Sequence, residues 1–271
     1  MDAQLLLRGI RSGFGFLTTI PVKPDEDGFE ALMGNIYIFI IVGALIGLIL
    51  GIVGVLLLWL LPHPLVPVLI LACIYLLTGI NHIDGLSDFG DGIIASGTAE
   101  KKAAAMKDVH AGAGGILFIG MDLLFLYATV SLFAGFGAPY LLTGLLVAET
   151  CAKVCISTVA AFGTSLHQGM GSMLIERTRK EHYMAGLAIA IVISVGAMWL
   201  LAFQPFIWRR ALLLPLAGFL AVALSVALGL LIVDIATKNF GGVSGDVMGA
   251  ANEAGRIASM LALGVLLWTL L

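Results

Sequence analysis

Residues 36–61 read IYIFIIVGALIGLILGIVGVLLLWLL and contain no charged side chain. A helix needs about 20 apolar residues to cross the hydrocarbon core of a bilayer, so this stretch alone is long enough to do so. The whole chain has the same character, because 60% of its 271 residues are hydrophobic, 11% are charged and the mean hydropathy is +1.08. Such a composition excludes a water-soluble domain, a disordered chain and a nucleic-acid binder that works through bulk basic charge.

Six further apolar stretches follow, and together they predict an all-α fold, a polytopic membrane bundle of about seven transmembrane helices. Their ranges are 64–80, 115–138, 139–162, 184–207, 211–233 and 257–271. Residues 1–21 contain Arg8 and Arg11 but no long apolar core, so they predict an amphipathic helix on the membrane surface. We interpret residues 1–271 as a single membrane domain.

Three connections between the predicted spans are long and polar, at about 81–114, 163–183 and 235–256. Lysine and arginine are enriched on the cytoplasmic side of membrane proteins. With the N-terminus inside, Arg209 and Arg210 face outward, whereas the cytoplasmic side receives Arg8, Arg11, Lys23, Lys101, Lys102, Lys107, Arg177, Arg179, Lys180, Lys238 and Arg256. We therefore expect a multi-pass protein of the plasma membrane whose polar connections, and active site, face the cytoplasm.

The strongest local signal is NHIDGLSDFGDG at residues 81–92, where Asp84, Asp88 and Asp91 are spaced i, i+4 and i+7. On a helix these positions share one face. Three adjacent carboxylates repel one another at a membrane edge unless cations bind between them, and such oxygen ligands suit an Mg²⁺ ion that also binds a substrate phosphate. His82 beside them either orients a carboxylate or acts as a base. The alternative is a solvated helix end with capping aspartates.

Two glycine-containing segments carry further polar candidates. In MKDVHAGAGG, residues 106–115, Lys107 could neutralise a phosphate, and the glycines would let a phosphate approach N–H groups at a helix N-terminus. In FGGVSGDVMGA, residues 240–250, Asp246 is either another metal ligand or a group that holds a hydroxyl. The alternatives are an ordinary helix start for the first segment and a flexible turn for the second.

Polar side chains inside the predicted spans are few. Asp122 and Glu149 are candidates because ionisable groups within a membrane are usually functional, although Glu149 and Lys153 are spaced i, i+4 and could simply pair. The cysteines lie in apolar stretches, and we interpret them as small hydrophobic residues: Cys73, Cys151 and Cys155. Gly43 and Gly47 form a GxxxG motif, which indicates either close packing within the chain or a dimer seam.

The three polar segments, in this order and together with FLTTIP at residues 16–21, resemble the cobalamin synthase family over nearly the whole chain. Members of that family are adenosylcobinamide-GDP ribazoletransferases. The resemblance implies an Mg²⁺-dependent integral membrane enzyme that performs the last step of nucleotide loop assembly. A hydroxyl of α-ribazole, or of its 5′-phosphate, attacks the phosphate on the cobinamide arm, GMP leaves, and adenosylcobalamin or its 5′-phosphate forms.

The resemblance also implies roles for individual residues. The implied catalytic set is His82, Asp84, Asp88, Asp91, Asp108 and Asp246. In it, Asp84, Asp88 and Asp91 hold Mg²⁺ against the diphosphate, Asp108 and Asp246 complete the metal shell or orient the incoming hydroxyl, and His82 helps to deprotonate that hydroxyl. Contacts to substrate phosphates are implied for Lys107, Gly112, Gly241, Gly242, Gly245 and, where the family has an arginine, Lys153.

The sequence departs from the family pattern at three places, of which Lys153 in place of an arginine, able to substitute only as a point charge, is one. Residues 109–111 read VHA where the family often has Ser-Arg-Ile, so a basic contact is either weakened or moved to His110. Ser244 stands where threonine is usual, which changes little.

The main alternative is a CDP-alcohol phosphatidyltransferase-like membrane phosphotransferase. Its signature is partly matched by Asp88, Asp91, Gly92 and Ala95, but Ser96 stands in the place of arginine. A prenyltransferase would need a second aspartate-rich motif, and a channel or transporter would place acids deep along several spans. The expected partners are therefore adenosylcobinamide-GDP, α-ribazole and the lipid bilayer, with no nucleic acid; a homo-oligomer stays open.

Overall fold

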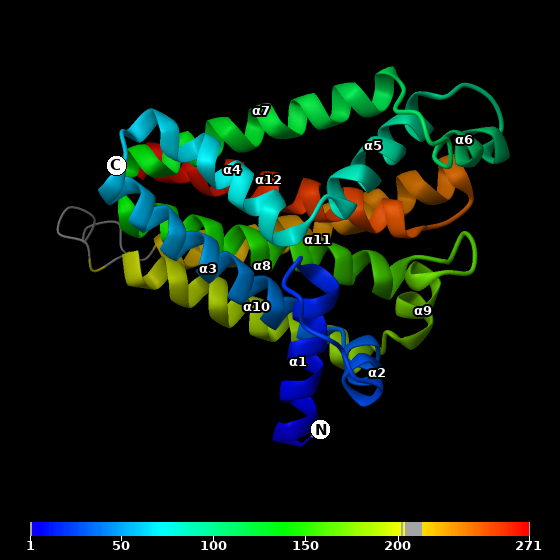
Figure 1. Ribbon diagram of the computed structural model, residues 1–271, viewed down its shortest axis with the longest axis horizontal. Helices are drawn as coiled ribbons and strands as arrows, with labels where there is room; N and C mark the ends of the chain where they lie inside the picture. The colour runs from blue at the N-terminus through cyan, green and yellow to red at the C-terminus, as the bar shows by residue number, and fades with distance from the viewer. Residues whose placement is uncertain (1, 202, 204–212, 271) are drawn as a thin grey trace.

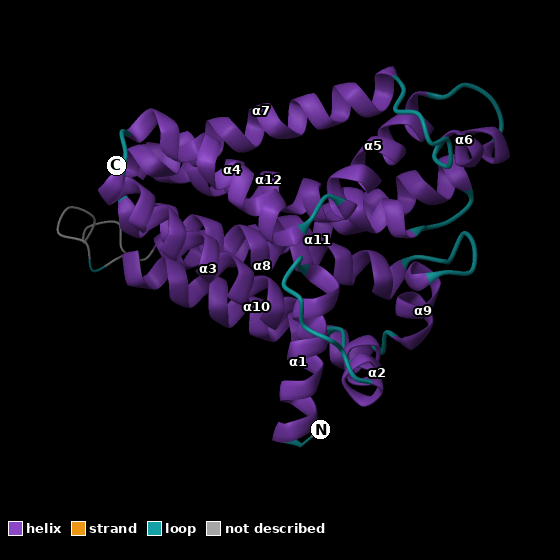
Figure 2. Cartoon of the chain, viewed as in Figure 1, coloured by secondary structure: helices purple, strands orange, loops and turns teal. Residues whose placement is uncertain are grey.

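The computed structural model describes residues 2–201, 203 and 213–270, which form a bundle of helices (Figure 1). Six of them are long and apolar enough to cross a membrane: α3 (Tyr37–Leu60), α7 (Ala113–Phe136), α8 (Ala138–Phe162), α10 (Lys180–Leu201), α11 (Leu213–Phe240) and α12 (Gly245–Leu270). Loops join the helices, and the described residues contain no strand (Figure 2). The prediction of an all-α polytopic bundle is confirmed.

The predicted span 64–80 is a broken one. The single-turn helix η1 (His63–Leu65) leads into α4 (Val66–Thr78), and α5 (Asn81–Ile94) then turns away from them by 97°. Gly79 lies at the bend with φ +70°, a conformation that glycine adopts readily because it has no Cβ. Counting the bent pair as one span brings the total to seven. We treat α5, which carries the three aspartates, as lying outside the spanning helices.

Helix α8 is the centre of the bundle and is buried along most of its length. Glycines of α3 bring the two backbones together, since a Cβ atom on Gly47 would lie 2.6 Å from the carbonyl oxygen of Leu145. A Cβ atom on Gly43 would likewise lie 2.7 Å from the carbonyl oxygen of Glu149. The GxxxG motif is therefore a packing seam within the chain, as the first of its two interpretations predicted.

The shorter helices gather at one end of the bundle, which we call the polar end. It contains α5, α6 (Ala99–Ala105), α9 (Met170–Arg177) and the connection between α11 and α12, whereas η1 and the C-terminus lie at the opposite end (Figure 1). The three predicted polar connections thus lie at the same end of the molecule.

Helix α1 (Ala3–Leu17) runs across the direction of the long helices in Figure 1. It packs on α2 (Glu26–Gly34), where the guanidinium of Arg8 lies 2.8 Å from a carboxylate oxygen of Asp25 and 2.8 Å from one of Asp27. The N-terminal helix is confirmed, and its position on a membrane surface stays a prediction. All three cysteines are free, with Cys151 and Cys155 buried and Cys73 half-buried, as expected of small hydrophobic residues.

Several predicted boundaries are wrong. The connection predicted at 235–256 is only residues 241–244, because α11 continues to Phe240 and α12 begins at Gly245. Arg256, predicted on the cytoplasmic surface, therefore lies inside a spanning helix and is fully buried. The end of the predicted span 184–207 and the start of 211–233 fall outside the described residues, together with Arg209 and Arg210.

Candidate active site

The site is built on the crossing of α5 and the start of α12. A Cβ atom on Gly85 would lie 2.7 Å from the carbonyl oxygen of Asp246, and one on Gly249 would lie 3.0 Å from the carbonyl oxygen of His82. Only glycine lets two helix backbones approach this closely. The crossing therefore places the aspartates of α5 beside Asp246, although more than 150 residues separate them in the sequence.

The carboxylates at this crossing lack basic partners. In the described part of the chain, no lysine, arginine or histidine lies within ion-pair distance of Asp84, Asp88, Asp91 or Asp246. Burial, followed by the negative charges of Asp246, Asp84 and Asp91, raises the pKa of Asp88 to about 6. The hydroxyl of Ser244 lies 3.2 Å from Asp246 Oδ2, to which it donates. This is a concentration of negative charge that the protein itself does not balance.

The carboxylate of Asp91 accepts hydrogen bonds from backbone N–H groups at the start of α7. Its Oδ2 accepts a hydrogen bond from the Gly112 N–H at 2.7 Å, and its Oδ1 accepts one from the Gly115 N–H at 2.9 Å. These groups form the start of α7, where N–H groups have no partner within the helix. A Cβ atom on either glycine would collide with the Asp91 carboxylate. In this structure the Gly112 N–H, predicted to contact phosphate, is therefore bonded to Asp91.

The segment just before α7 is exposed to solvent. Lys107, Asp108 and His110 are all exposed. Asp108 Oδ1 accepts the backbone N–H of His110 and lies 3.0 Å from its Nδ1, and these hydrogen bonds, the backbone one first, lower the pKa of the Asp108 carboxyl. The structure thus brings Asp108 to His110 and does not place it among the other aspartates.

The short connection 241–244 is fixed by backbone hydrogen bonds to the segment that follows α8. Val243 donates its N–H to the Thr164 carbonyl at 2.8 Å and accepts the Leu166 N–H at 2.9 Å. Gly242 packs tightly there, since a Cβ atom on it would lie 2.8 Å from the Thr164 carbonyl oxygen, whereas Gly245 faces open space and Gly241 has φ +85°. The third segment is therefore a fixed turn, and the flexible-turn alternative does not describe it.

Lys153 lies in a different place from the other predicted residues. It is fully buried in α8, with Nζ 2.6 Å from Asn252 Oδ1 and 3.6 Å from Glu149 Oε2, so the predicted pairing of Glu149 with Lys153 is confirmed. Arg256 joins the group, with Nε 2.5 Å from Glu149 Oε1 and its Nη1 against Glu253. We call Glu149, Lys153, Asn252, Glu253 and Arg256 the buried charge network. A substrate contact by Lys153 would require this network to open.

The network includes residues that the sequence reasoning missed, namely Asn252 and Glu253. A signal was present, because Glu253 and Arg256 are spaced i, i+3 and form one helical face with Asn252 next to it. Asp122, left open before, is buried in α7, where its Oδ2 accepts the Tyr75 hydroxyl at 3.1 Å and its Oδ1 has no partner in the described structure.

A pocket of about 370 Å³ lies beside the α5–α12 crossing. Asn81, His82, Asp84 and Asp246 line it together with apolar residues from α1, α2, α3, α8 and α9. The Nδ1 atom of His82 is buried and has no hydrogen-bond partner among the described residues. Burial, followed by the positive charges of Lys153 and Arg256, lowers the pKa of His82 well below its usual value, so its imidazole is neutral.

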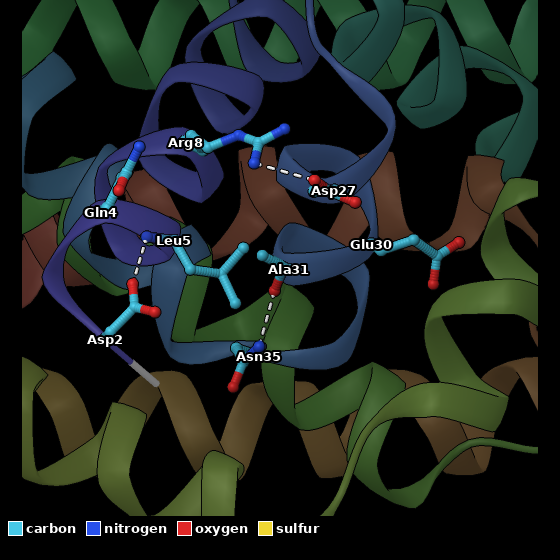
Figure 3. Close-up of a pocket in the computed structure, with 8 residues that line it drawn as sticks. All are labelled: Asp2, Gln4, Leu5, Arg8, Asp27, Glu30, Ala31 and Asn35. Carbon is cyan, nitrogen blue, oxygen red and sulfur yellow. Dashed lines mark hydrogen bonds and ion pairs between the residues drawn. The ribbon is translucent and has the colours of Figure 1, made fainter.

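A second pocket, of about 580 Å³, lies between α1 and α2 (Figure 3). Arg8, Asp27, Glu30 and Asn35 line it, and Arg8 is already paired with Asp27. It contains none of the predicted catalytic or substrate-binding residues. The smaller pocket beside α5 is therefore the better candidate for the active site.

The carboxylates at the α5–α12 crossing suit one kind of metal site better than another. Among the described residues, no three His, Cys, Asp or Glu side chains form a group able to hold a metal ion. Mg²⁺, however, usually binds through one or two carboxylates and completes its shell with waters and substrate phosphates. Asp84 and Asp246 at the pocket, with Asp88 behind them, fit that kind of site better than an all-protein cage.

Comparison with known proteins gives a consistent result. The family model for cobalamin-5-phosphate synthase matches residues 9–264. An adenosylcobinamide-GDP ribazoletransferase from Methanocella arvoryzae is 52% identical over 267 residues, which cover 97% of this chain and 97% of the relative. Proteins of the same name from Methanosarcina barkeri and Archaeoglobus fulgidus are 36% and 33% identical, over 98% and 90% of this chain and 94% and 91% of theirs. No solved structure matches.

Proposed function

The chain belongs to the cobalamin-5-phosphate synthase family, and from that premise we propose how its polar end carries out the reaction. The protein is a multi-pass membrane transferase that joins the adenosylcobinamide-phosphate group of adenosylcobinamide-GDP to α-ribazole, the final step of nucleotide loop assembly. GMP is released. The family match favours this activity over the CDP-alcohol phosphatidyltransferase alternative.

The α5–α12 crossing is the observation that carries the proposal. It brings Asp84 and Asp88 beside Asp246 at the edge of a pocket, with no basic residue of the described chain to balance their charge. A diphosphate substrate would be repelled by these carboxylates without cations between them. We therefore propose that Mg²⁺ binds between the substrate phosphates and one or two of the carboxylates of Asp84, Asp88 and Asp246, with waters completing its shell. A bound Mg²⁺ would stabilise negative charge on the diphosphate and on the leaving GMP.

Asp91 is assigned a mainly structural role, which is to hold α7 against α5. Its two hydrogen bonds to Gly112 and Gly115 fix the start of α7 against α5. Each carboxylate oxygen keeps a second lone pair, so Asp91 also stays predicted as a metal ligand.

His82 is the candidate to receive the proton of the attacking hydroxyl. The residue lines the pocket together with Asp84, and its Nδ1 lacks a partner in the described structure. Loss of that proton lets the hydroxyl oxygen of α-ribazole form a bond to the phosphorus on the cobinamide side while the bond from that phosphorus to the GMP phosphate breaks.

The phosphate contacts remain proposals of unequal support. Gly245 faces open space at the start of α12, beside Asp246, and suits an N–H contact to a substrate phosphate. Lys107 is exposed at the polar end, in the segment before α7. Gly241, Gly242, Gly112 and Lys153 stay predicted phosphate contacts, although the first two shape a fixed turn and the other two are bonded to protein groups. Asp108 stays predicted to complete the metal shell or to orient the incoming hydroxyl, although here it is bonded to His110.

The orientation of the protein is also proposed. Lys101, Lys102, Lys107, Arg177 and Lys238 all belong to the polar end. Basic residues favour the cytoplasmic side, so we place the polar end and its active site in the cytoplasm, with the bundle in the plasma membrane.

The test is a transfer assay with purified protein in lipid. Adenosylcobinamide-GDP and α-ribazole are supplied with and without Mg²⁺, and GMP and the corrinoid product are both measured. We expect GMP release in equal amount to product, lost on chelation and restored by Mg²⁺. Full turnover in the presence of a chelator would remove the metal proposal and leave the transferase activity standing.

A further inference from the structure

We call Asp84, Asp88, Asp91 and Asp246 the acidic cluster. The pocket beside it is lined by polar residues on one side and by apolar residues on the other. The polar lining residues include Asp84, which is exposed, and Asp246, which is half-buried. The buried residues are apolar, and we call them the pocket floor: Leu17, Met33, Phe39, Ile156 and Leu174, each at most 5% exposed. A ligand that fills this space must therefore have one polar end and one apolar end.

The floor is rigidly held. The ring of Phe39 packs edge-to-face on Phe16, with centroids 6.0 Å apart, and Phe16 packs in turn on Phe29 at 6.4 Å. Just after α1, Thr19 donates its N–H to the Leu77 carbonyl at 2.8 Å, which ties the end of α1 to the end of α4. A floor fixed in this way is preorganised for a ligand, because few side chains remain to be ordered on binding.

We propose that this pocket binds the base of the nucleoside acceptor, an apolar bicyclic aromatic ring, and so presents the ribose hydroxyl to the acidic cluster. The inference rests on the proposed function and assigns one substrate to one place in it. α-Ribazole has a dimethylbenzimidazole base, which carries two methyl groups and no exocyclic hydrogen-bonding group.

The other ligand groups fit less well. A corrin macrocycle is too large for about 370 Å³. The guanine of the donor has a polar edge, and the five apolar side chains of the floor offer it no hydrogen-bond partner. Burying that edge without partners would weaken binding. The acceptor base is the substrate part with the matching apolar surface.

His82 supplies the second observation. The residue lines the same pocket, and its buried Nδ1 lacks a partner among the described residues. Buried polar atoms normally have a hydrogen-bond partner, so this one points to a polar atom of the ligand between the floor and the acidic cluster. The ribose hydroxyl of an acceptor whose base lies on the floor is such an atom.

The first test needs no variant. Equilibrium dialysis with wild-type protein, without donor, compares α-ribazole with the riboside of unsubstituted benzimidazole. Each methyl group buried on the floor strengthens binding, so loss of both should raise Kd about tenfold. Equal Kd values, or no binding of either nucleoside, would overturn the proposal. Because the assay has no turnover, binding with this methyl dependence but without transfer would sink the proposed function and leave the pocket assignment standing.

The second test changes the floor. Phe39→Leu enlarges it, and we expect KM for α-ribazole to rise about tenfold while KM for adenosylcobinamide-GDP stays within about twofold. The matched control is Phe133→Leu, a fully buried phenylalanine near the opposite end of the bundle, which should leave both KM values within about twofold. A rise in donor KM instead of acceptor KM in Phe39→Leu would assign the floor to the donor and overturn the proposal.

Discussion

Glu149 and Glu253 lie deep in the bundle and both contact Arg256, whereas Asp84 and Asp246 lie at the polar end with no basic residue within ion-pair distance in the described chain. The two regions use the same chemical groups in opposite ways. In the buried charge network, two carboxylates meet one lysine and one arginine, so the charge is balanced within the protein. At the acidic cluster the balance is left to ligands. Charge that the chain neutralises holds helices together, and charge that it leaves uncompensated is available for chemistry.

The largest expected effect on stability comes from removing one charge from the buried charge network. Arg256→Met leaves Glu149 and Glu253 buried with Lys153 as their one cation, and the loss of one partner from a buried charge pair costs about 3–5 kcal/mol of stability. Thermal unfolding in detergent or lipid should show it as a large drop in Tm. In the double variant Glu253→Gln with Arg256→Met, one charge of each sign is lost, and we expect a smaller drop. An unchanged Tm in the single variant would mean that the network is not structural.

The complementary change is at the acidic cluster. Asp246→Asn removes one uncompensated charge, so we expect Tm to change little while GMP release falls about 100- to 1000-fold, the usual loss when one electrostatic contact to a transition state is removed. Asp234→Asn is the matched control, because Asp234 is an exposed aspartate of α11 paired with Lys238 at 2.7 Å. Its activity should stay within about twofold of wild type. Equal losses in the two variants would contradict a special role for Asp246.

A smaller effect should come from the backbone crossing that holds the cluster. In Gly85→Ala the new Cβ atom meets the backbone of Asp246, so α5 and α12 must move apart and carry Asp84 away from Asp246. Misplacement of reacting groups by a fraction of an ångström lowers the rate, and we expect a loss of about 10- to 100-fold in kcat. Gly120→Ala in α7 is the control, since no atom lies within 4 Å of its added Cβ. Full activity in Gly85→Ala would show that the spacing is not limiting.

The smallest expected effect separates the two roles of Asp91. Asp91→Asn keeps the shape of the side chain but removes the charge that faces the start of α7, which should cost about 1 kcal/mol of stability. The measurement is Tm together with the Mg²⁺ concentration needed for half-maximal GMP release. A helix-holding role predicts a lower Tm and a nearly normal Mg²⁺ requirement. A large rise in the Mg²⁺ requirement would make Asp91 a metal ligand instead.

Much of the fold could be predicted because the membrane imposes a simple rule on the sequence. Residues 36–61 and 139–162 match α3 and α8 closely, since long apolar runs form spanning helices wherever they occur. The rule fails where charges neutralise one another inside the bundle. Arg256 looked like a surface residue because its partner Glu149, 107 residues away, meets it only when α8 and α12 are packed together.

The site was predictable by residue type and less so by geometry. The spacing of the aspartates on α5 placed them on one helix, but it could not show that Asp91 faces the N–H groups of α7. Gly85 and Gly249 were a usable signal, because glycine inside a helix often marks a close backbone approach. The pocket floor was not visible at all, since Leu17, Phe39 and Leu174 come from three helices and resemble ordinary core residues.

The broken span has a consequence for the lipid around it. From His63 to Thr78 the helix rises only about 25 Å, less than the roughly 30 Å of a hydrocarbon core, and its outer face carries exposed Leu65, Val68 and Leu76. Acyl chains beside α4 must therefore compress to match it. Only residues 79 and 80 separate α4 from α5, so we expect bilayer thickness to affect the position of the aspartates. We expect turnover in vesicles to depend on acyl-chain length, so that the membrane is a tuning parameter of this enzyme as well as its solvent.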